Sequence, residues 1–282
     1  MIVPRTIQTP ADVAEHYDEL DPFYREIWGE HVHHGLWTTG RETPDQAVEN
    51  LVAHLAGTLD LRPGQHVCDV GCGYGATAEW LSRRYGVHVT GVTLSSAQLR
   101  QAQMRSAASP LLGFTRQDWL ENAFEDESFD HVIAIESSEH MPDKQRFFDE
   151  ACRTLRPGGR LAVYAWLARD NARPWEARHL LEPICREGRL PGMGSEAEYR
   201  EWARQAGFVV DGFEDLSTKV RRTWALCTKR VAGKLLTQPR YRRYLLDAQA
   251  RNRIFVLSVP RIWVAYLTGA MRYGLLTACK PL

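Results

Sequence analysis

The chain has 282 residues, of which 44% are hydrophobic and 25% charged, with 35 basic and 35 acidic side chains. This composition is ordinary for a globular protein of one large domain, or of a core domain with a cap. Because no stretch of 18 apolar residues is free of charge and the first residues are polar, we expect neither a membrane-spanning helix nor a secreted protein. The six cysteines form no CxxC pair, which predicts reduced thiols, a cytoplasmic location and no metal site.

The first predicted elements are helices. Residues 11–60 have a helical pattern, with a break expected at Asp21-Pro22 and a loop near Trp37–Pro44. Pro44 opens the second helix of this region, in the first turn, where proline is tolerated. These patterns predict an N-terminal helical cap over 1–60.

A strand and a glycine turn follow the cap. The short apolar run His66–Val70 leads into Gly71–Gly75, which has glycine at alternate positions, and a helix is expected over Ala76–Tyr85. Such glycines let backbone approach a ligand closely. The G-x-G-x-G spacing differs from the G-x-G-x-x-G of dinucleotide sites, and Asp69 before it is typical of S-adenosylmethionine (SAM) sites. The alternative is a tight strand-to-helix turn of any α/β protein.

Strands and helices then alternate along the chain. Further strands are expected over Val87–Leu94, Phe114–Gln117, His131–Ile135, Leu161–Trp166, Phe208–Phe213 and Tyr273–Cys279. Further helices are expected over Ser96–Ser106, Asp143–Leu155, Ser195–Gln205, Thr223–Leu236, Arg240–Ala250 and Ile254–Leu267. This order predicts an α/β fold with a doubly wound, mainly parallel, seven-stranded sheet. We divide it into a core over 61–217, a helical lid insertion over 218–270 and a final core strand over 271–282.

The charges are segregated along the chain. Residues 219–282 hold 14 Lys or Arg and a single acidic residue, Asp247. Three partners fit this surplus: the acidic remainder of the protein, an anionic substrate, or an anionic membrane surface. Arg253–Val264 is amphipathic, but we expect it to pack within the lid. Nucleic acid is not expected as a partner, because the basic residues are interleaved with apolar stretches and match no nucleic-acid motif.

At this point the residues resemble a known family, the class I SAM-dependent methyltransferases. The core match runs from Val70–Gly75 to the turn Leu155–Gly159. Nearly the whole chain resembles the tocopherol methyltransferase-like branch, whose members methylate C, N or O atoms of small molecules; this match is carried by Tyr17-Asp18, Ile27–Trp37, Glu136–Lys144 and Leu155–Gly159. A more distant resemblance to mycolic-acid cyclopropane synthases lies in Gly91–Ser95 and Gln98. The resemblance implies a Rossmann-like sheet under a helical lid, SAM as cofactor and S-adenosylhomocysteine as product.

The resemblance also implies which residues bind the cofactor. The second strand ends without the carboxylate that many relatives use for the ribose, so a hydroxyl and an amide are expected to replace it. Without the resemblance, Asp118 is simply a helix cap and Trp119 a core residue. The implied set is Asp69, Gly71, Gly73 and Gly75 for the methionine part; Thr93, Leu94 and Gln98 for the ribose; Asp118 and Trp119 for the adenine; Tyr17 for the carboxylate; and Glu136.

Candidate catalytic groups follow the fourth predicted strand, at Glu136, Glu139 and His140. Methyl transfer from a sulfonium needs positioning, exclusion of water and, for some acceptors, one base. His140 can accept a proton from a phenol, an amine or an activated carbon while Glu139 orients it. The alternative is that both residues cap the following helix and bond the N-terminal segment.

The acceptor pocket is predicted from the same resemblance and from the aromatic content of the lid. The cluster His31–His34 lacks the spacing and the companion ligands of a zinc site, so we expect no metal there. The segment is instead expected to lie near the sulfonium and the acceptor. The predicted pocket residues are Tyr24, His33, His34, Trp166 and Trp224.

These inferences predict a SAM-dependent methyltransferase that acts on a lipophilic small molecule: a phenol, a prenylated aromatic or a terpenoid. One alternative is C-methylation of an alkene in a terpenoid or prenyl diphosphate, and another is a non-methylating cyclase or binding module with the same fold. Cyclopropanation is disfavoured, because His34-Gly35-Leu36 occupies the region where cyclopropane synthases carry a cysteine. A homo-oligomer and a peripheral membrane contact stay open.

Overall fold

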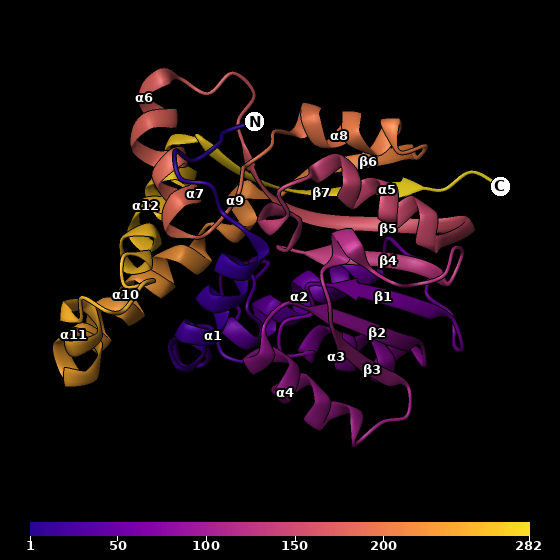
Figure 1. The fold of residues 1–282 in the computed structure, drawn as a ribbon, viewed down its shortest axis with the longest axis horizontal. Coiled ribbons are helices and arrows are strands. Elements are labelled where there is room, and N and C mark those ends of the chain that lie inside the picture. The colour runs from indigo at the N-terminus through magenta and orange to yellow at the C-terminus, as the bar shows by residue number, and fades with distance from the viewer.

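The computed structural model describes residues 1–282 and contains one seven-stranded sheet in the order β3-β2-β1-β4-β5-β7-β6 (Figure 1). The strands are β1 (His66–Val70), β2 (His88–Thr93), β3 (Leu112–Arg116), β4 (Phe129–Ile135), β5 (Leu155–Ala168), β6 (Val209–Asp215) and β7 (Met271–Cys279). β7 runs antiparallel to β5 and β6, and the other neighbours are parallel. The predicted Rossmann-like, mainly parallel sheet is confirmed.

The helices lie mainly between the strands in sequence. They are α1 (Pro10–Ile27), α2 (Pro44–Ala56), α3 (Ala76–Tyr85), α4 (Ser96–Ser106), α5 (Lys144–Thr154), α6 (Pro174–Glu176), α7 (Glu182–Glu187), α8 (Glu196–Gln205), α9 (Ser217–Val220), α10 (Arg222–Thr237), α11 (Pro239–Leu246) and α12 (Phe255–Thr268). Shorter turns are η1 (Trp119–Glu121), η2 (Ser138–His140) and η3 (Ala177–Leu181). Ser195 caps α8, because its hydroxyl accepts from the backbone N–H of Glu198.

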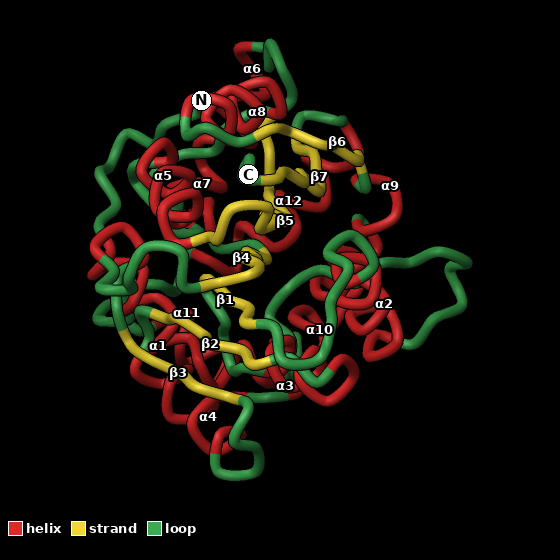
Figure 2. Tube along the Cα trace, turned by 90° about the vertical axis from the view of Figure 1, so that its right-hand side faces the viewer, coloured by secondary structure: helices red, strands yellow, loops and turns green.

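Alternating side chains of the strands build two cores, one on each face of the sheet. On β4, Val132 and Ala134 pack with Phe147 of α5, whereas Ile133 packs on the opposite face with Leu51 of α2. Figure 2 shows α5 and α2 on opposite sides of the strands. Burial on both faces explains the continuous apolar runs of the central strands.

The lid gathers segments that are far apart in the sequence. α10 packs against α11 and α12, and α1 from the N-terminal region packs against α10. Figure 1 shows these helices together at one end of the sheet, with α11 farthest from the strands. No helix is both long enough and apolar enough to cross a membrane.

The elements differ from the predicted ones in a few places. The break expected at Asp21-Pro22 is wrong: α1 continues through Pro22, because Leu20, Tyr24 and Ile27 on either side of the proline are buried. The helix expected over Arg240–Ala250 ends at Leu246. β5 begins at Leu155, so the predicted turn Arg156–Gly159 belongs to an irregular start of that strand, and α6 to α7 fill a stretch for which no element was predicted.

Candidate active site

A cavity of about 740 Å³ lies where β1, β2, β3 and β4 end. Ligands bind at the carboxyl ends of the strands in sheets of this kind, because the loops that follow several strands converge there. Its wall contains Val70 and Gly71 at the end of β1, Thr93 and Leu94 at the end of β2, and Gln117 after β3. The other lining residues are Pro10, Val13, Tyr17, Val32, Gly73, Val92, Ser95, Gln98, Asp118, Trp119, Ile135, Glu136, Ser137, His140, Met141 and Pro142. We call this space the strand-end cavity.

The glycine turn forms one wall of the strand-end cavity. Gly71, Gly73 and Gly75 all have positive φ angles, of 81°, 53° and 76°. At Gly73 an added Cβ would meet no atom within 4 Å, so the backbone there borders open space. At Gly75 an added Cβ would lie 2.7 Å from the ring of Phe114, so the absence of a side chain here allows Phe114 to pack closely against the turn. Only Gly71 and Gly73 of the predicted trio line the cavity.

Asp69 lies beneath the same turn with an unused hydrogen-bond acceptor. Its side chain is buried, and its Oδ2 atom has no hydrogen-bond partner. Burial raises the pKa of Asp69 to about 7. An unpartnered carboxylate oxygen in the interior is costly, and an amino group or a bridging water of a ligand would satisfy it. Asp69 therefore fits the ammonium group of SAM.

The ribose residues implied by the resemblance form a hydrogen-bonded pair. The Thr93 hydroxyl donates to Oε1 of Gln98 over 2.8 Å, and both residues line the cavity. The backbone N–H of Ser95 donates to the Thr93 hydroxyl, and Asp18 of α1 accepts from the Ser95 hydroxyl. The pair is thus braced from the sheet side and from the N-terminal helix, and the Gln98 amide N–H₂ can donate to a ribose hydroxyl.

Asp118 and Trp119 combine a structural role with a place in the cavity wall. Asp118 caps η1 by accepting from the N–H of Leu120 over 2.9 Å, and the Trp119 indole donates to the carbonyl of Phe147. Both also line the strand-end cavity. The two sequence interpretations, capping or core residue and ligand contact, are therefore compatible in this structure.

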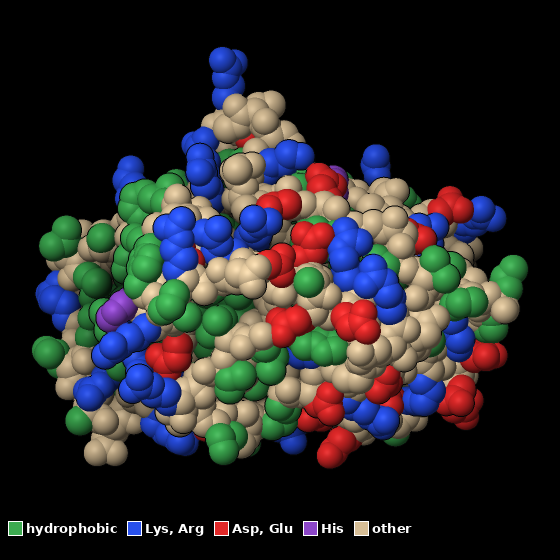
Figure 3. Space-filling model, turned by 90° about the horizontal axis from the view of Figure 1, so that it is seen from above, with side chains coloured by type: hydrophobic (Ala, Val, Ile, Leu, Met, Phe, Trp, Pro, Cys, Tyr) green, Lys and Arg blue, Asp and Glu red, His purple; other side chains and the backbone are tan.

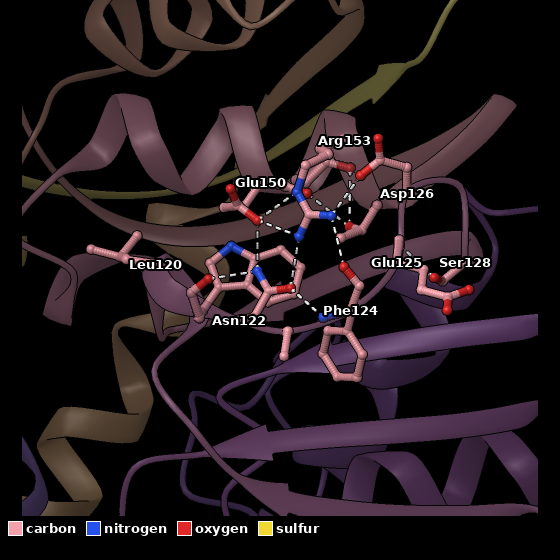
Figure 4. A network of polar contacts seen from close by, with 12 residues as sticks. Leu120, Asn122, Phe124, Glu125, Asp126, Ser128, Glu150 and Arg153 are labelled. Carbon is pink, nitrogen blue, oxygen red and sulfur yellow. Dashed lines mark hydrogen bonds and ion pairs between the residues drawn. The ribbon is translucent and has the colours of Figure 1, made fainter.

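The loop after η1 is fastened to α5 by Arg153 (Figure 4). This guanidinium donates to the carboxylates of Glu150 and Asp126 and to the Asn122 amide oxygen. Asn122 donates in turn to the carbonyl of Trp119 over 2.8 Å. The network therefore holds the segment that carries the Asp118–Trp119 wall in a fixed position.

The charge of the strand-end cavity selects the kind of ligand. Among its 21 lining residues are two carboxylates, Asp118 and Glu136, one histidine and no Lys or Arg. A dinucleotide or another phosphate ligand would find no cation here, whereas a cationic sulfonium and ammonium group would be stabilised. The residues present fit SAM better than a phosphate-bearing cofactor.

Glu136 holds the lid to the end of β4. Its carboxylate accepts from the backbone and Nδ1 of His34, from the Trp166 indole and from the Tyr273 hydroxyl, all at 2.7–2.9 Å. Burial alone would raise the pKa of Glu136, but electrostatic attraction to the His34 ring and the hydrogen bonds from His34 lower it to about 2. With its pKa lowered and four donors around it, the carboxylate supplies fixed negative charge and not a proton acceptor.

His140 faces the strand-end cavity beside Tyr17. Its Nδ1 lies 3.3 Å from the Arg189 carbonyl and its Nε2 lies 2.9 Å from the Tyr17 hydroxyl. Because a carbonyl only accepts, Nδ1 carries the proton and Nε2 accepts from Tyr17. Burial lowers the pKa of His140 to about 4, so the ring is neutral at neutral pH. It is therefore in the protonation state that a base requires.

Glu139 does not make the contact with His140 that the sequence suggested. Its buried carboxylate accepts from the backbone N–H of Trp166, and its own carbonyl accepts from the Lys144 ammonium. Burial raises the pKa of Glu139 and lowers that of Lys144. The Arg189 carbonyl takes the orienting position beside His140, and Glu139 fastens η2 to β5.

Comparison with known proteins agrees with this geometry. The sequence model of the mycolic acid cyclopropane synthetase family matches residues 5–272. The chain belongs to this family. It is 32% identical to 27-O-demethylrifamycin SV methyltransferase of Amycolatopsis mediterranei, over 98% of this chain and 99% of that protein. It is 30% identical to the chloroplastic tocopherol O-methyltransferase of Arabidopsis thaliana, over 96% of this chain and 82% of that one.

Solved structures agree in fold. The [4+2]-cyclase SpnF superposes with a TM-score of 0.84 at 25% identity, over the whole of both chains. The mycolic acid cyclopropane synthase CmaA1, crystallised with S-adenosylhomocysteine, superposes with a TM-score of 0.82 over 98% of this chain and 99% of that one, at 23% identity. The protein is accordingly a SAM-dependent methyltransferase, as predicted.

A second cavity of this methyltransferase lies inside the lid. It measures about 490 Å³, and 13 of its 15 lining residues are hydrophobic. α1 supplies Tyr24, α10 supplies Leu235, α11 supplies Leu245 and α12 supplies Val256 and Val259. We call this space the lid cavity. Of the predicted acceptor residues, Tyr24 lines it.

Two stacked tyrosines of α1 stand between the cavities. Tyr17 lines the strand-end cavity and Tyr24 the lid cavity, and their ring centroids are 5.4 Å apart. The Tyr24 hydroxyl lies 2.9 Å from Nε2 of the buried His16, whose Nδ1 lies 3.2 Å from the amide oxygen of Asn252. The partition is therefore held by hydrogen bonds from α1 and from the segment before α12.

The remaining predicted acceptor residues are packed away from both cavities. His34, Trp166 and Trp224 contact one another edge to face, with ring centroids 5.4–5.6 Å apart. His33 is buried beside a smaller cavity of about 300 Å³. His34 and Trp166 donate to the carboxylate of Glu136, and the contact of these four residues with an acceptor stays a prediction.

Some residues of the site were not singled out from the sequence. Gln117 precedes Asp118 at the end of β3, so its position in the strand pattern is a usable signal. His16, Arg189 and Asn252 come from three distant segments and join only through tertiary hydrogen bonds. No local pattern marks them.

Proposed function

We propose that this methyltransferase transfers the methyl group of SAM to a lipophilic small molecule of the phenolic, prenylated aromatic or terpenoid class. The observation that carries the proposal is the apolar lid cavity next to the polar strand-end cavity. Its almost entirely hydrophobic walls suit the body of such an acceptor. The names of the two relatives, which refer to a rifamycin and to tocopherol, support a bulky acceptor.

In this proposal the cofactor residues act by position and charge. When bound, SAM supplies a sulfonium methyl group that a nucleophilic atom takes in line. Asp69 accepts from the amino group, Gly71 and Gly73 let backbone lie close to the methionine part, and Asp118 accepts from the adenine amino group. Glu136 keeps its negative charge near the sulfonium. These groups bind and orient the cofactor so that the acceptor atom can attack the methyl group in line.

His140 is the proposed base. Its Nε2 carries a lone pair that now accepts from the Tyr17 hydroxyl. When an acceptor hydroxyl or activated C–H is deprotonated, the Tyr17 proton passes to Nε2 and the Tyr17 oxygen takes the acceptor's proton. The Arg189 carbonyl stabilises the imidazolium through Nδ1–H. Tyr17 therefore links the base to the acceptor and also separates the two cavities.

The test uses purified protein, SAM with a labelled methyl group, and a panel of phenols, quinols, prenyl diphosphates, terpenoids and unsaturated lipids, with glycine as a small polar control. We expect label on one lipophilic class, with an equal amount of S-adenosylhomocysteine released. Label only on a polar control would overturn the acceptor assignment.

The same assay separates the alternatives. C-methylation of an alkene would give a product with a new carbon–carbon bond from a prenyl diphosphate or terpenoid. The [4+2]-cyclase among the structural relatives supports a non-methylating reaction as an alternative. Such a reaction would change an acceptor without change of mass and without S-adenosylhomocysteine release. A cytoplasmic location and a homo-oligomer stay predictions, which cell fractionation and sedimentation velocity test.

A further inference from the structure

The outer face of α12 is apolar although it faces solvent. Ile254, Leu257, Pro260, Val264 and Leu267 are all exposed, with Leu257 at 52%. Their spacing of three or four residues places them on one side of the helix, along a stripe about 20 Å long. The inner face, by contrast, is buried. A stripe of this length differs from the scattered apolar residues that any protein surface carries.

The neighbouring helices continue this apolar surface. Leu236 at the end of α10 is 81% exposed, and Leu246 at the end of α11 is 83% exposed. Arg242 donates to the carbonyl of Leu236, and Arg253, beside Ile254, donates to the carbonyl of Asp247, so hydrogen bonds join α11 to the end of α10 and link the residue after α11 to the segment before α12. Figure 3 shows hydrophobic and basic side chains intermingled at the end of the molecule where Figure 1 places the lid.

The basic surplus of residues 219–282 is only partly neutralised within the protein. Seven of its 14 Lys and Arg pair with carboxylates, such as Arg240 with Glu26 and Arg261 with Glu187. The other seven form no ion pair: Arg221, Arg222, Lys229, Arg230, Arg242, Arg243 and Arg253. Arg242, Arg243 and Arg253 flank the exposed leucines. Pairing with carboxylates of the same chain therefore accounts for half of these basic residues.

We propose that this lid surface docks on an anionic lipid bilayer. It is formed by Leu236, Leu246, Ile254, Leu257, Val264 and Leu267, with Arg242, Arg243 and Arg253 at its edges. Apolar side chains would enter the interfacial region while the arginines extend to lipid phosphates, as in interfacial amphipathic helices. A second copy of the chain is a poor occupant, because pairing two such surfaces would bring two basic lids together.

The lid surface lies beside the lid cavity. Leu245, Arg253 and Val256 line that cavity, and each is adjacent in sequence to an exposed residue of the surface. A docked protein would therefore hold the cavity against the bilayer, and a lipophilic molecule could enter without crossing water. The docking itself does not depend on methyl transfer.

The test is sedimentation of the full chain with vesicles of phosphatidylcholine alone, or of phosphatidylcholine with 30% phosphatidylglycerol. We expect binding to the anionic vesicles that weakens as salt rises. Leu246→Ser with Leu257→Ser should reduce the bound fraction at least fivefold, and Arg243→Glu should reduce it most at low salt. Met104→Ser and Val209→Ser change equally exposed apolar residues outside the lid and should bind like the wild type.

Each other outcome overturns the proposal. One is absence of wild-type sedimentation at low salt; another is equal loss in the Met104 and Val209 controls. A dimer in sedimentation velocity that Leu257→Ser dissociates would assign the surface to a second copy. Unchanged thermal unfolding of the variants verifies folding. If the Leu246→Ser/Leu257→Ser variant still methylates an acceptor dispersed in detergent, its lower vesicle binding is a loss of docking and not a failure of the proposed activity.

Discussion

The two cavities of this protein are built by different parts of the chain in different ways. The strand-end cavity is made by residues that follow β1 to β4, within a segment from Val70 to Pro142 apart from four residues of the N-terminal region. The lid cavity is made by α1 and by helices more than 200 residues later. The first is polar and carries carboxylates, and the second is apolar. The contrast indicates that cofactor binding and acceptor selection can vary separately in this fold.

The largest expected effect tests the strand-end cavity. Gly73→Val should abolish SAM binding in calorimetry, because its Cβ would project into open space that the ligand needs and its φ of 53° disfavours a branched residue. Gly64→Val is the matched control, since Gly64 has a φ of 82° and equally open surroundings away from the cavity. It should keep SAM affinity. Retained binding in Gly73→Val would undo the cofactor assignment.

The next largest effect concerns the base at the boundary of the cavities. His140→Ala should reduce kcat about 100-fold while leaving SAM affinity near that of the wild type. His131 is another buried histidine whose pKa burial lowers to about 4, but it does not line the strand-end cavity, so His131→Ala is the control. Turnover unchanged in His140→Ala would remove this residue from the mechanism.

Changes in the lid cavity should affect the KM for the acceptor and not the affinity for SAM. Leu245→Trp fills part of it and should raise the acceptor KM about tenfold without changing SAM affinity. Leu246→Trp adds the same bulk one residue later, where the side chain is exposed, and should leave the acceptor KM unchanged when the acceptor is dispersed in detergent. An equal effect of both variants would mean that the lid cavity does not hold the acceptor.

The pH dependence of SAM binding should follow Asp69, which lies just before the glycine turn that borders the strand-end cavity. Burial raises the pKa of Asp69 from 3.8 to about 7. The protonated side chain therefore stabilises the ligand-free folded protein at acidic pH, and this stabilisation is lost as the pH rises through 7. A cationic ligand needs the carboxylate, so SAM affinity should rise up to tenfold per pH unit toward pH 7 and then level. Asp69→Asn should lower the affinity and flatten the profile in calorimetry between pH 5.5 and 8.5.

The smallest expected effect tests the support of the Asp118–Trp119 wall. Arg153→Ala leaves the buried Glu150 carboxylate without its main partner and should reduce the free energy of unfolding by about 1–3 kcal/mol. SAM affinity should fall only a few-fold, because the wall residues remain present. Arg146→Ala removes a more exposed partner of Glu150 and should cost less in a urea titration. Equal losses would mean that the Arg153 network does not brace the loop.

The sequence alone determined the class of the sheet and which residues converge at its edge. Apolar runs alternating with helical segments predicted seven mainly parallel strands, and short motifs at strand ends, such as Gly71, Gly73 and Asp118, line one cavity because parallel strands end at the same edge. Both features are local in the chain, so a pattern of a few residues can carry them.

Only the tertiary structure decided the partners of the catalytic groups and the shape of the lid. Arg189, and not Glu139, bonds Nδ1 of His140, and His16 and Asn252 brace the partition between the cavities. These contacts join residues separated by tens to hundreds of positions. They follow from how helices pack over the sheet, and which face of α12 stays exposed depends on that packing as well. A hydrophobic period indicates which helix face is apolar, but the surrounding elements decide whether that face is covered.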